Sequence, residues 1–162
     1  MYLAQTAPAL GDVARNLDQH LETISAAKRE GAQLVVFPEL SLTGYFLNDL
    51  TDDVALATDD RLLKRLVAAS RGLSVAFGFV ERARDHRVHN AAAFAENGKL
   101  LHVHRKVHLP TYGIFDEGRY LAPGDRFRAF DTSFGRVGVL VCEDAWHLAS
   151  SWLLFLQDVD VL

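Results

Sequence analysis

The chain has 162 residues, a length typical of one domain, and its 49% hydrophobic and 23% charged residues are ordinary for a globular protein. A formal net charge of −4 argues against a nucleic-acid or anionic-membrane partner, since both favour a basic surface. The one cysteine, Cys142, excludes an intrachain disulfide and is consistent with a reducing compartment. Neither a signal peptide nor a membrane-spanning segment is predicted, so the expected location is the cytoplasm.

Strand-like and helix-like segments alternate along the first half of the chain, which is typical of an α/β layered fold. A short strand is expected at residues 1–7, and Asp12 is placed to cap a helix that runs to about residue 30. Residues 34–37 form a continuous apolar run of the kind that is buried on both faces of a sheet. A second helix is predicted at residues 61–72.

Residues 74–81 are then expected to form another strand, and a β-hairpin follows it. Its strands are predicted at residues 90–95 and 100–106, because Asn97-Gly98 between two such runs is a strong turn signal. Residues 109–124 are rich in glycine, proline and aromatic side chains and are expected to form a loop.

The last part of the chain repeats the strand-then-helix pattern. Residues 137–141 are predicted to form a buried strand that Cys142 closes, followed by a helix through residues 146–156. Residues 158–162 resemble the start of a further strand, and the pattern stops there. The expectation is therefore a domain of residues 1–162 that lacks its C-terminal portion.

Three residues whose side chains are suited to catalysis lie at predicted strand ends. Cys142 is expected on a strand-to-helix turn, where the helix N-terminus favours the thiolate. Glu39 follows Pro38 at the tip of a buried strand, where partial desolvation makes a carboxylate a usable base. Lys106 ends the second hairpin strand, and an ammonium beside a reacting carbonyl stabilises an oxyanion.

Each of these residues, taken alone, also has an ordinary interpretation. Cys142 suits a buried core position equally well, Glu39 suits a solvated loop, and Lys106 suits the surface. Ligand crevices in open α/β sheets lie outside the carboxyl ends of strands, where all three residues are expected. That shared location favours one common site.

Three motifs, in this order, resemble those of the nitrilase superfamily of carbon–nitrogen hydrolases. They are FPELSLTGY at residues 37–45, HRKVHLP at residues 104–110 and GVLVCED at residues 138–144. The resemblance implies part of a four-layer α-β-β-α sandwich and a catalytic triad of Glu39, Lys106 and Cys142.

The mechanism implied by the resemblance is cysteine amidase chemistry on a small-molecule amide. Cys142 would attack the carbonyl carbon, Glu39 would transfer the proton to the leaving amine, and Lys106 with the backbone N–H of Glu143 would hold the oxyanion. No cofactor and no metal would be needed. The family also implies a homodimer.

A fourth stretch, YGIFDEGRY at residues 112–120, resembles the glutaminase domains of glutamine-dependent NAD synthetases. Glu117 matches a glutamate that supports the triad, and Tyr112 matches a residue that lines the substrate pocket. Two alternatives to a stand-alone amidase therefore stay open. One is a glutaminase module that supplies ammonia to a NAD synthetase, and the other is a truncated remnant without activity.

Three histidines lie close together in the sequence. His102 and His104 would point to the same face of a strand, as two metal ligands could, and His108 follows them. No cysteine or acidic residue stands nearby at metal-ligand spacing. Packing is therefore favoured over a metal site.

Overall fold

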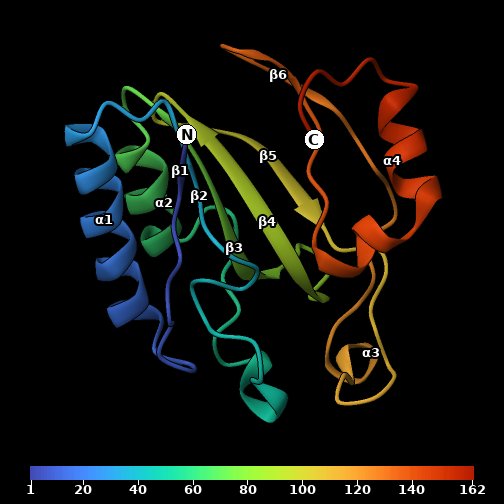
Figure 1. Ribbon diagram of the computed structural model, residues 1–162. Helices are drawn as coiled ribbons and strands as arrows, with labels where there is room; N and C mark the ends of the chain where they lie inside the picture. The colour runs from blue at the N-terminus through green and yellow to red at the C-terminus, as the bar shows by residue number, and fades with distance from the viewer.

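A five-stranded sheet forms the centre of the computed structural model, which describes residues 1–162 (Figure 1). The strand order follows the chain order. The first three strands are parallel to one another, whereas the third pairs antiparallel with the fourth and the fourth antiparallel with the fifth. The strands are β1 (Tyr2–Leu3), β2 (Leu34–Val36), β3 (Ser74–Arg82), β4 (Val88–Glu96) and β5 (Lys99–Arg105).

The predicted hairpin is confirmed as β4 and β5. Asn97 and Gly98 form its turn with φ values of 50° and 79°, a left-handed conformation that asparagine and glycine accept most readily. Because β5 ends at Arg105, Lys106 directly follows the strand. The first predicted strand, at residues 1–7, is shorter than expected and pairs with β2 only over Tyr2–Leu3.

Two helices, α1 (Val13–Arg29) and α2 (Arg61–Ala69), cover one face of the sheet (Figure 1). As predicted, Asp12 caps α1, and its side chain accepts a hydrogen bond from the Arg15 backbone N–H at 3.0 Å. The main hydrophobic core lies between these helices and the sheet. Its fully buried members include Leu17 and Ile24 of α1, Leu63 and Leu66 of α2, and Val75, Phe77 and Phe79 of β3.

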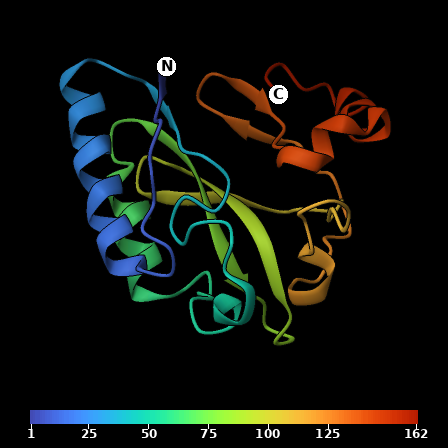
Figure 2. The same cartoon turned by 60° about the horizontal axis from the view of Figure 1, so that its bottom comes forward.

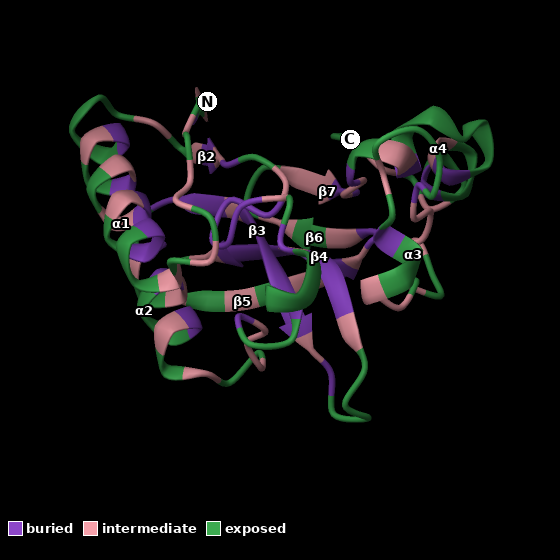
Figure 3. Cartoon of the chain, turned by 90° about the horizontal axis from the view of Figure 1, so that it is seen from below, coloured by how far each residue is buried: buried purple, intermediate pink, exposed green.

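The opposite face of the sheet carries a second, smaller hydrophobic cluster of Leu40, Leu47, Val54 and Val80. The short helices η1 (Asn48–Thr51) and α3 (Glu117–Tyr120) lie in the connecting segments, so the predicted loop at residues 109–124 contains one helical turn. Figure 3 shows that the buried residues concentrate in β3 and β4.

Beyond this face lie a hairpin and the C-terminal helices (Figure 2). The hairpin pairs β6 (Phe130–Thr132) with β7 (Gly135–Val137), and the helices are η2 (Cys142–Trp146) and α4 (Leu148–Phe155). From α1 and α2 to α4, the layers follow the order α-β-β-α (Figure 1). The fold class is therefore α/β, as predicted.

The buried strand predicted at residues 137–141 is wrong for most of its length. Strand β7 ends at Val137, and after it the Gly138 N–H donates to the Val161 carbonyl at 2.9 Å. An apolar run becomes a strand only where neighbouring backbone is available to pair with it. The predicted strand at residues 158–162 likewise reduces to a single bridge between Val137 and Val161. No helix combines the length and the apolar character needed to cross a membrane.

Candidate active site

Glu39 lies on a tight turn that follows β2 and packs directly on β3. Leu40 has a φ of 47°, a left-handed conformation that is uncommon for leucine. The turn approaches Gly78 so closely that a Cβ atom there would lie 2.2 Å from the Leu40 nitrogen and 2.9 Å from the Glu39 carbonyl carbon. Only glycine at position 78 therefore lets the turn occupy this place.

The Glu39 carboxylate accepts two hydrogen bonds on one oxygen. Asn90 Nδ2 donates to Oε1 at 2.8 Å, and Lys106 Nζ donates to the same oxygen at 2.7 Å. The side chain is 19% exposed, so it is desolvated but reachable. Both donors approach Oε1, which leaves Oε2 available for another partner.

Lys106 is completely buried, with a side-chain exposure of 0%. Its ammonium also donates to Glu117 Oε1 at 2.7 Å and so lies between two carboxylates. Burial lowers the pKa of Lys106, but the hydrogen bonds with Glu117 and Glu39 outweigh it and raise the pKa above its ordinary value. The lysine therefore keeps its positive charge at neutral pH.

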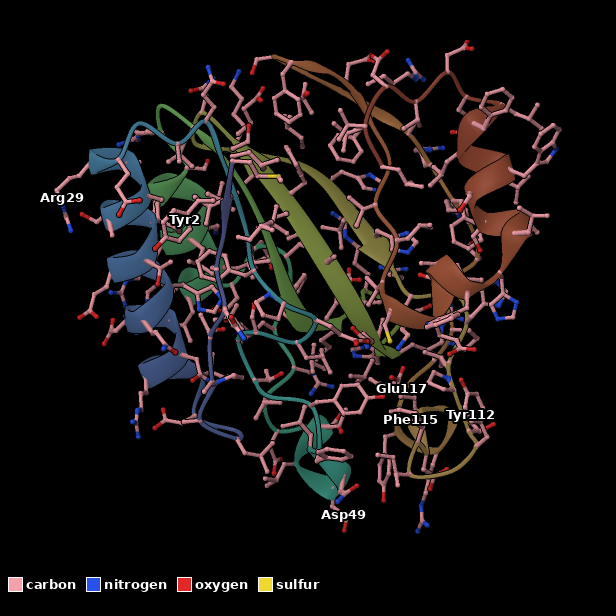
Figure 4. The ribbon with its side chains drawn as sticks, viewed as in Figure 1. Tyr2, Arg29, Asp49, Tyr112, Phe115 and Glu117 are labelled. Carbon is pink, nitrogen blue, oxygen red and sulfur yellow. The ribbon has the colours of Figure 1, made fainter.

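Glu117 is supported in turn by Tyr45, whose hydroxyl donates to Glu117 Oε1. Burial and this hydrogen bond raise the pKa of Tyr45, so the phenol remains a donor. Figure 4 shows Glu117 close to Phe115 and Tyr112 on the segment beneath the sheet. Tyr45 was not predicted as a site residue, although it is the last residue of the glutamate motif.

Cys142 is exposed and has a φ of 45° at the start of η2. Partial burial of the thiol raises the pKa of Cys142, and the negative charge of Glu39 raises it further. The expectation that the thiolate is favoured at this turn is therefore wrong, because burial and the charge of Glu39 favour the protonated thiol. The thiol is therefore protonated at neutral pH.

Cys142 and Glu39 line the same cavity of about 140 Å³. The other lining residues are mostly apolar and come from β2, β3 and β4 and from the segment before Cys142. The predicted Glu39, Lys106, Cys142 and Glu117 thus come together at one end of the sheet. Asn90 also lies there, although it was not predicted as a site residue. The only feature in the sequence that distinguishes it is an amide side chain in a strand of mostly small apolar residues.

Tyr112 and Glu143 meet beside this group. The Tyr112 hydroxyl donates to Glu143 Oε2 at 2.7 Å, and His147 Nε2 lies 3.6 Å from Glu143 Oε1. The hydrogen bond with Glu143 raises the pKa of Tyr112. Tyr112 is 59% exposed, whereas the side chain of Glu143, the residue after Cys142, is only 16% exposed.

The histidines of β5 have separate surroundings. His102 stacks on Phe130 with ring centroids 4.5 Å apart, whereas His104 Nε2 bonds to Asp144 Oδ2 at 2.8 Å. No group of three or more His, Cys, Asp or Glu side chains is arranged to hold a metal ion.

Comparison with known proteins finds a matching family and several relatives. Residues 3–162 match the family described as carbon–nitrogen hydrolase. A glutamine-dependent NAD(+) synthetase from Thermotoga maritima is 39% identical over 148 residues, which cover 90% of this chain and 25% of that protein.

Solved structures with the same fold include a synthetase and an amidase. A glutamine-dependent NAD+ synthetase from Acinetobacter baumannii aligns with a TM-score of 0.86 and 34% identity, over 99% of this chain and 31% of that one. An amidase from Nesterenkonia sp. aligns with a TM-score of 0.80 and 25% identity, over 91% of this chain and 57% of that one. The chain therefore spans less than a third of the synthetase relatives.

Proposed function

The chain belongs to the carbon–nitrogen hydrolase family, and we propose that it hydrolyses a small, linear, non-peptide amide through a thioester on Cys142. The proposal rests on one observation, the convergence of Glu39 with both Lys106 and Cys142. Glu39 accepts a hydrogen bond from Lys106 at 2.7 Å and shares a cavity with Cys142. A nucleophile, a base and a fixed cation are the groups that acyl transfer requires.

In the first half of the reaction, Glu39 takes the thiol proton while the sulfur of Cys142 bonds to the amide carbon. The raised pKa of Cys142 fits this order, because the proton leaves only as the bond forms. The oxyanion is held by Lys106 and by the backbone N–H of Glu143. Glu39 then returns the proton to the amide nitrogen, and the carbon–nitrogen bond breaks.

Water completes the cycle by attacking the thioester. Glu39 accepts a proton from that water, the carbon–sulfur bond breaks, and the thiol regains its proton as the carboxylic acid departs. Glu117 does not touch the substrate in this scheme. Its carboxylate, 2.7 Å from the Lys106 ammonium, balances a buried charge and fixes its direction.

Glutamine is the substrate that a separate observation favours. The Glu143 carboxylate accepts a hydrogen bond from Tyr112 beside the proposed nucleophile, and at 16% side-chain exposure it can accept further hydrogen bonds from the ammonium group of an amino acid. The synthetase relatives are named for their dependence on glutamine. In this second candidate function, the ammonia released from glutamine would supply a NAD synthetase.

An ammonia-release assay over aliphatic amides, asparagine and glutamine tests both candidates. We expect hydrolysis by the wild-type chain and none by Cys142→Ala, because no other thiol is present. A preference for glutamine that is lost in Glu143→Gln would favour the glutaminase. Turnover that survives in Cys142→Ala would contradict the mechanism, and a wild-type chain inactive on every amide would favour a non-catalytic remnant.

A further inference from the structure

Asp144 is a completely buried carboxylate, with a side-chain exposure of 0%, located two residues after Cys142. It accepts four hydrogen bonds. Oδ2 accepts from His104 Nε2 at 2.8 Å and from the Val141 backbone N–H at 3.2 Å. Oδ1 accepts from the backbone N–H groups of Val107 at 3.0 Å and His108 at 2.9 Å. All four donors come from the segments that carry Cys142 and Lys106.

We propose that Asp144 is a positioning residue that fixes the distance and orientation between Cys142 and Lys106. One carboxylate oxygen holds the backbone just before the cysteine, and the other holds the two residues just after the lysine. The proposal rests on the function proposed above, since it assigns the separation of the nucleophile and the cation to one side chain.

The conformation of Cys142 requires such a support. A φ of 45° is unfavourable for a residue with a side chain and persists only where surrounding contacts hold it. The Asp144 N–H donates to the Val141 carbonyl at 3.0 Å, and the Val141 N–H donates back to Asp144 Oδ2. These two bonds enclose Cys142 and hold the turn closed.

An aspartate is the only short side chain that can satisfy all four donors. An ionised carboxylate accepts hydrogen bonds and donates none, whereas an asparagine amide must point two N–H groups toward one pair of donors. In either amide orientation, those N–H groups would face at least one backbone N–H. Burial raises the pKa of Asp144, but the hydrogen bond with His104 and those with the backbone outweigh it and lower the pKa.

The test compares Asp144→Asn with Glu81→Gln. Glu81 is also buried, at 5% side-chain exposure, and binds Arg105 at 2.6 Å without contacting the Cys142 turn. Three quantities are measured for each variant: the melting temperature, kcat and KM for ammonia release, and the pH dependence of iodoacetamide alkylation at the single thiol. Both variants should lower the melting temperature.

Only Asp144→Asn should lower kcat, by about 100-fold, since a displacement near 1 Å costs this much when reacting groups must be aligned. KM should change little, and the alkylation midpoint should shift to lower pH as the thiol moves away from Glu39. An Asp144→Asn variant with wild-type kcat and a wild-type alkylation profile would overturn the proposal, whatever its melting temperature.

A second pair of variants covers the case in which Asp144→Asn does not fold. His104→Gln keeps an N–H donor for Asp144 and should retain the wild-type alkylation profile, whereas His104→Leu should shift it in the direction expected for Asp144→Asn. Equal profiles in the two variants would contradict the proposal. The alkylation profile can be measured without turnover. A wild-type chain that releases no ammonia would therefore refute the proposed hydrolase, and the alkylation profiles would still test the role of Asp144.

Discussion

At the residue scale, the main feature is that both hydrogen bonds to the Glu39 carboxylate are made to one of its two oxygens. Lys106 and Asn90 both donate to Oε1, at 2.7 and 2.8 Å. A carboxylate with one oxygen held by two donors has a fixed plane, and its other oxygen points in one direction. The proposed base is thus oriented before a substrate arrives, and the proposed proton transfer from the thiol needs no rearrangement.

Asn90→Ala tests this orientation. The substitution removes one charge-assisted hydrogen bond, worth about 1.5 kcal/mol, which corresponds to about a tenfold loss in kcat. KM should change less, because Asn90 contacts the base in this structure. Steady-state ammonia release measures both constants.

Ser74→Ala is the matched control for Asn90→Ala. Ser74 is buried on β3 and donates to Glu96 at 2.8 Å, so its loss also removes a buried hydrogen bond, but at the opposite end of the sheet. A tenfold fall in kcat for both variants would mean that the effect reflects general destabilisation and not the orientation of Glu39.

At the element scale, the site depends on how closely the turn after β2 approaches β3. Gly78 makes this approach possible, since a Cβ atom would lie 2.2 Å from the Leu40 nitrogen and 2.8 Å from the Pro38 carbonyl oxygen. Both neighbours are backbone atoms, so neither can swing aside as a side chain would. The turn itself must move if position 78 gains a methyl group.

Gly78→Ala should therefore lower both stability and activity. We expect kcat to fall by about 100-fold, because Glu39 is carried on the displaced turn. Gly72→Ala is the control: Gly72 has a φ of 82° and open space around it, so alanine there adds backbone strain far from the site. Urea unfolding and ammonia release should separate the two variants, and equal kcat values in them would contradict this role for Gly78.

Elements that depend on local signals were predictable from the sequence, whereas those that depend on distant partners were not. Asp12 and Asn97-Gly98 correctly located α1 and the β4–β5 hairpin. Residues 138–141 carry the composition of a buried strand, but strand formation requires neighbouring backbone that sequence alone does not identify. The β6–β7 hairpin was missed because its turn lacks an Asn-Gly pair.

The same distinction holds within the site. Strand ends and motifs pointed to Glu39, Lys106 and Cys142. In the fold, Glu39 and Cys142 line one cavity, and the Lys106 ammonium donates to Glu39. Asn90 and Asp144 were missed because their partners lie 51 and 40 residues away in the sequence. Contacts over such separations are set by the register of the sheet, which a pattern of residue types does not specify.

At the scale of the whole molecule, the main core and the site lie on opposite faces of one sheet, and His20 connects them. Its ring is 1% exposed within α1 and stacks on Phe37, with ring centroids 4.1 Å apart. Nδ1 lies 2.7 Å from the Asn16 carbonyl oxygen, and Nε2 lies 2.9 Å from the Ser41 hydroxyl. Ser41 belongs to the motif of Glu39, so these contacts connect α1 to the segment that carries the proposed base.

This buried histidine should make the folded state sensitive to acid. Burial lowers the pKa of His20 from 6.5 to about 4, although the backbone hydrogen bond with Asn16 opposes it. Between these pH values the unfolded chain binds the proton and the folded chain does not, so the free energy of unfolding falls as the pH falls from 6.5 to about 4. The loss from this group is on the order of 3 kcal/mol.

His20→Gln should flatten that pH dependence, because glutamine can hydrogen-bond to Ser41 and does not titrate. Urea unfolding of both proteins at pH 7 and pH 4.5 measures the effect. We expect the variant to be less stable than the wild type at pH 7, where it lacks the stacking on Phe37, and the difference to narrow at pH 4.5. If the free energy of unfolding of His20→Gln falls between pH 7 and pH 4.5 by as much as that of the wild type, groups other than His20 cause the acid sensitivity.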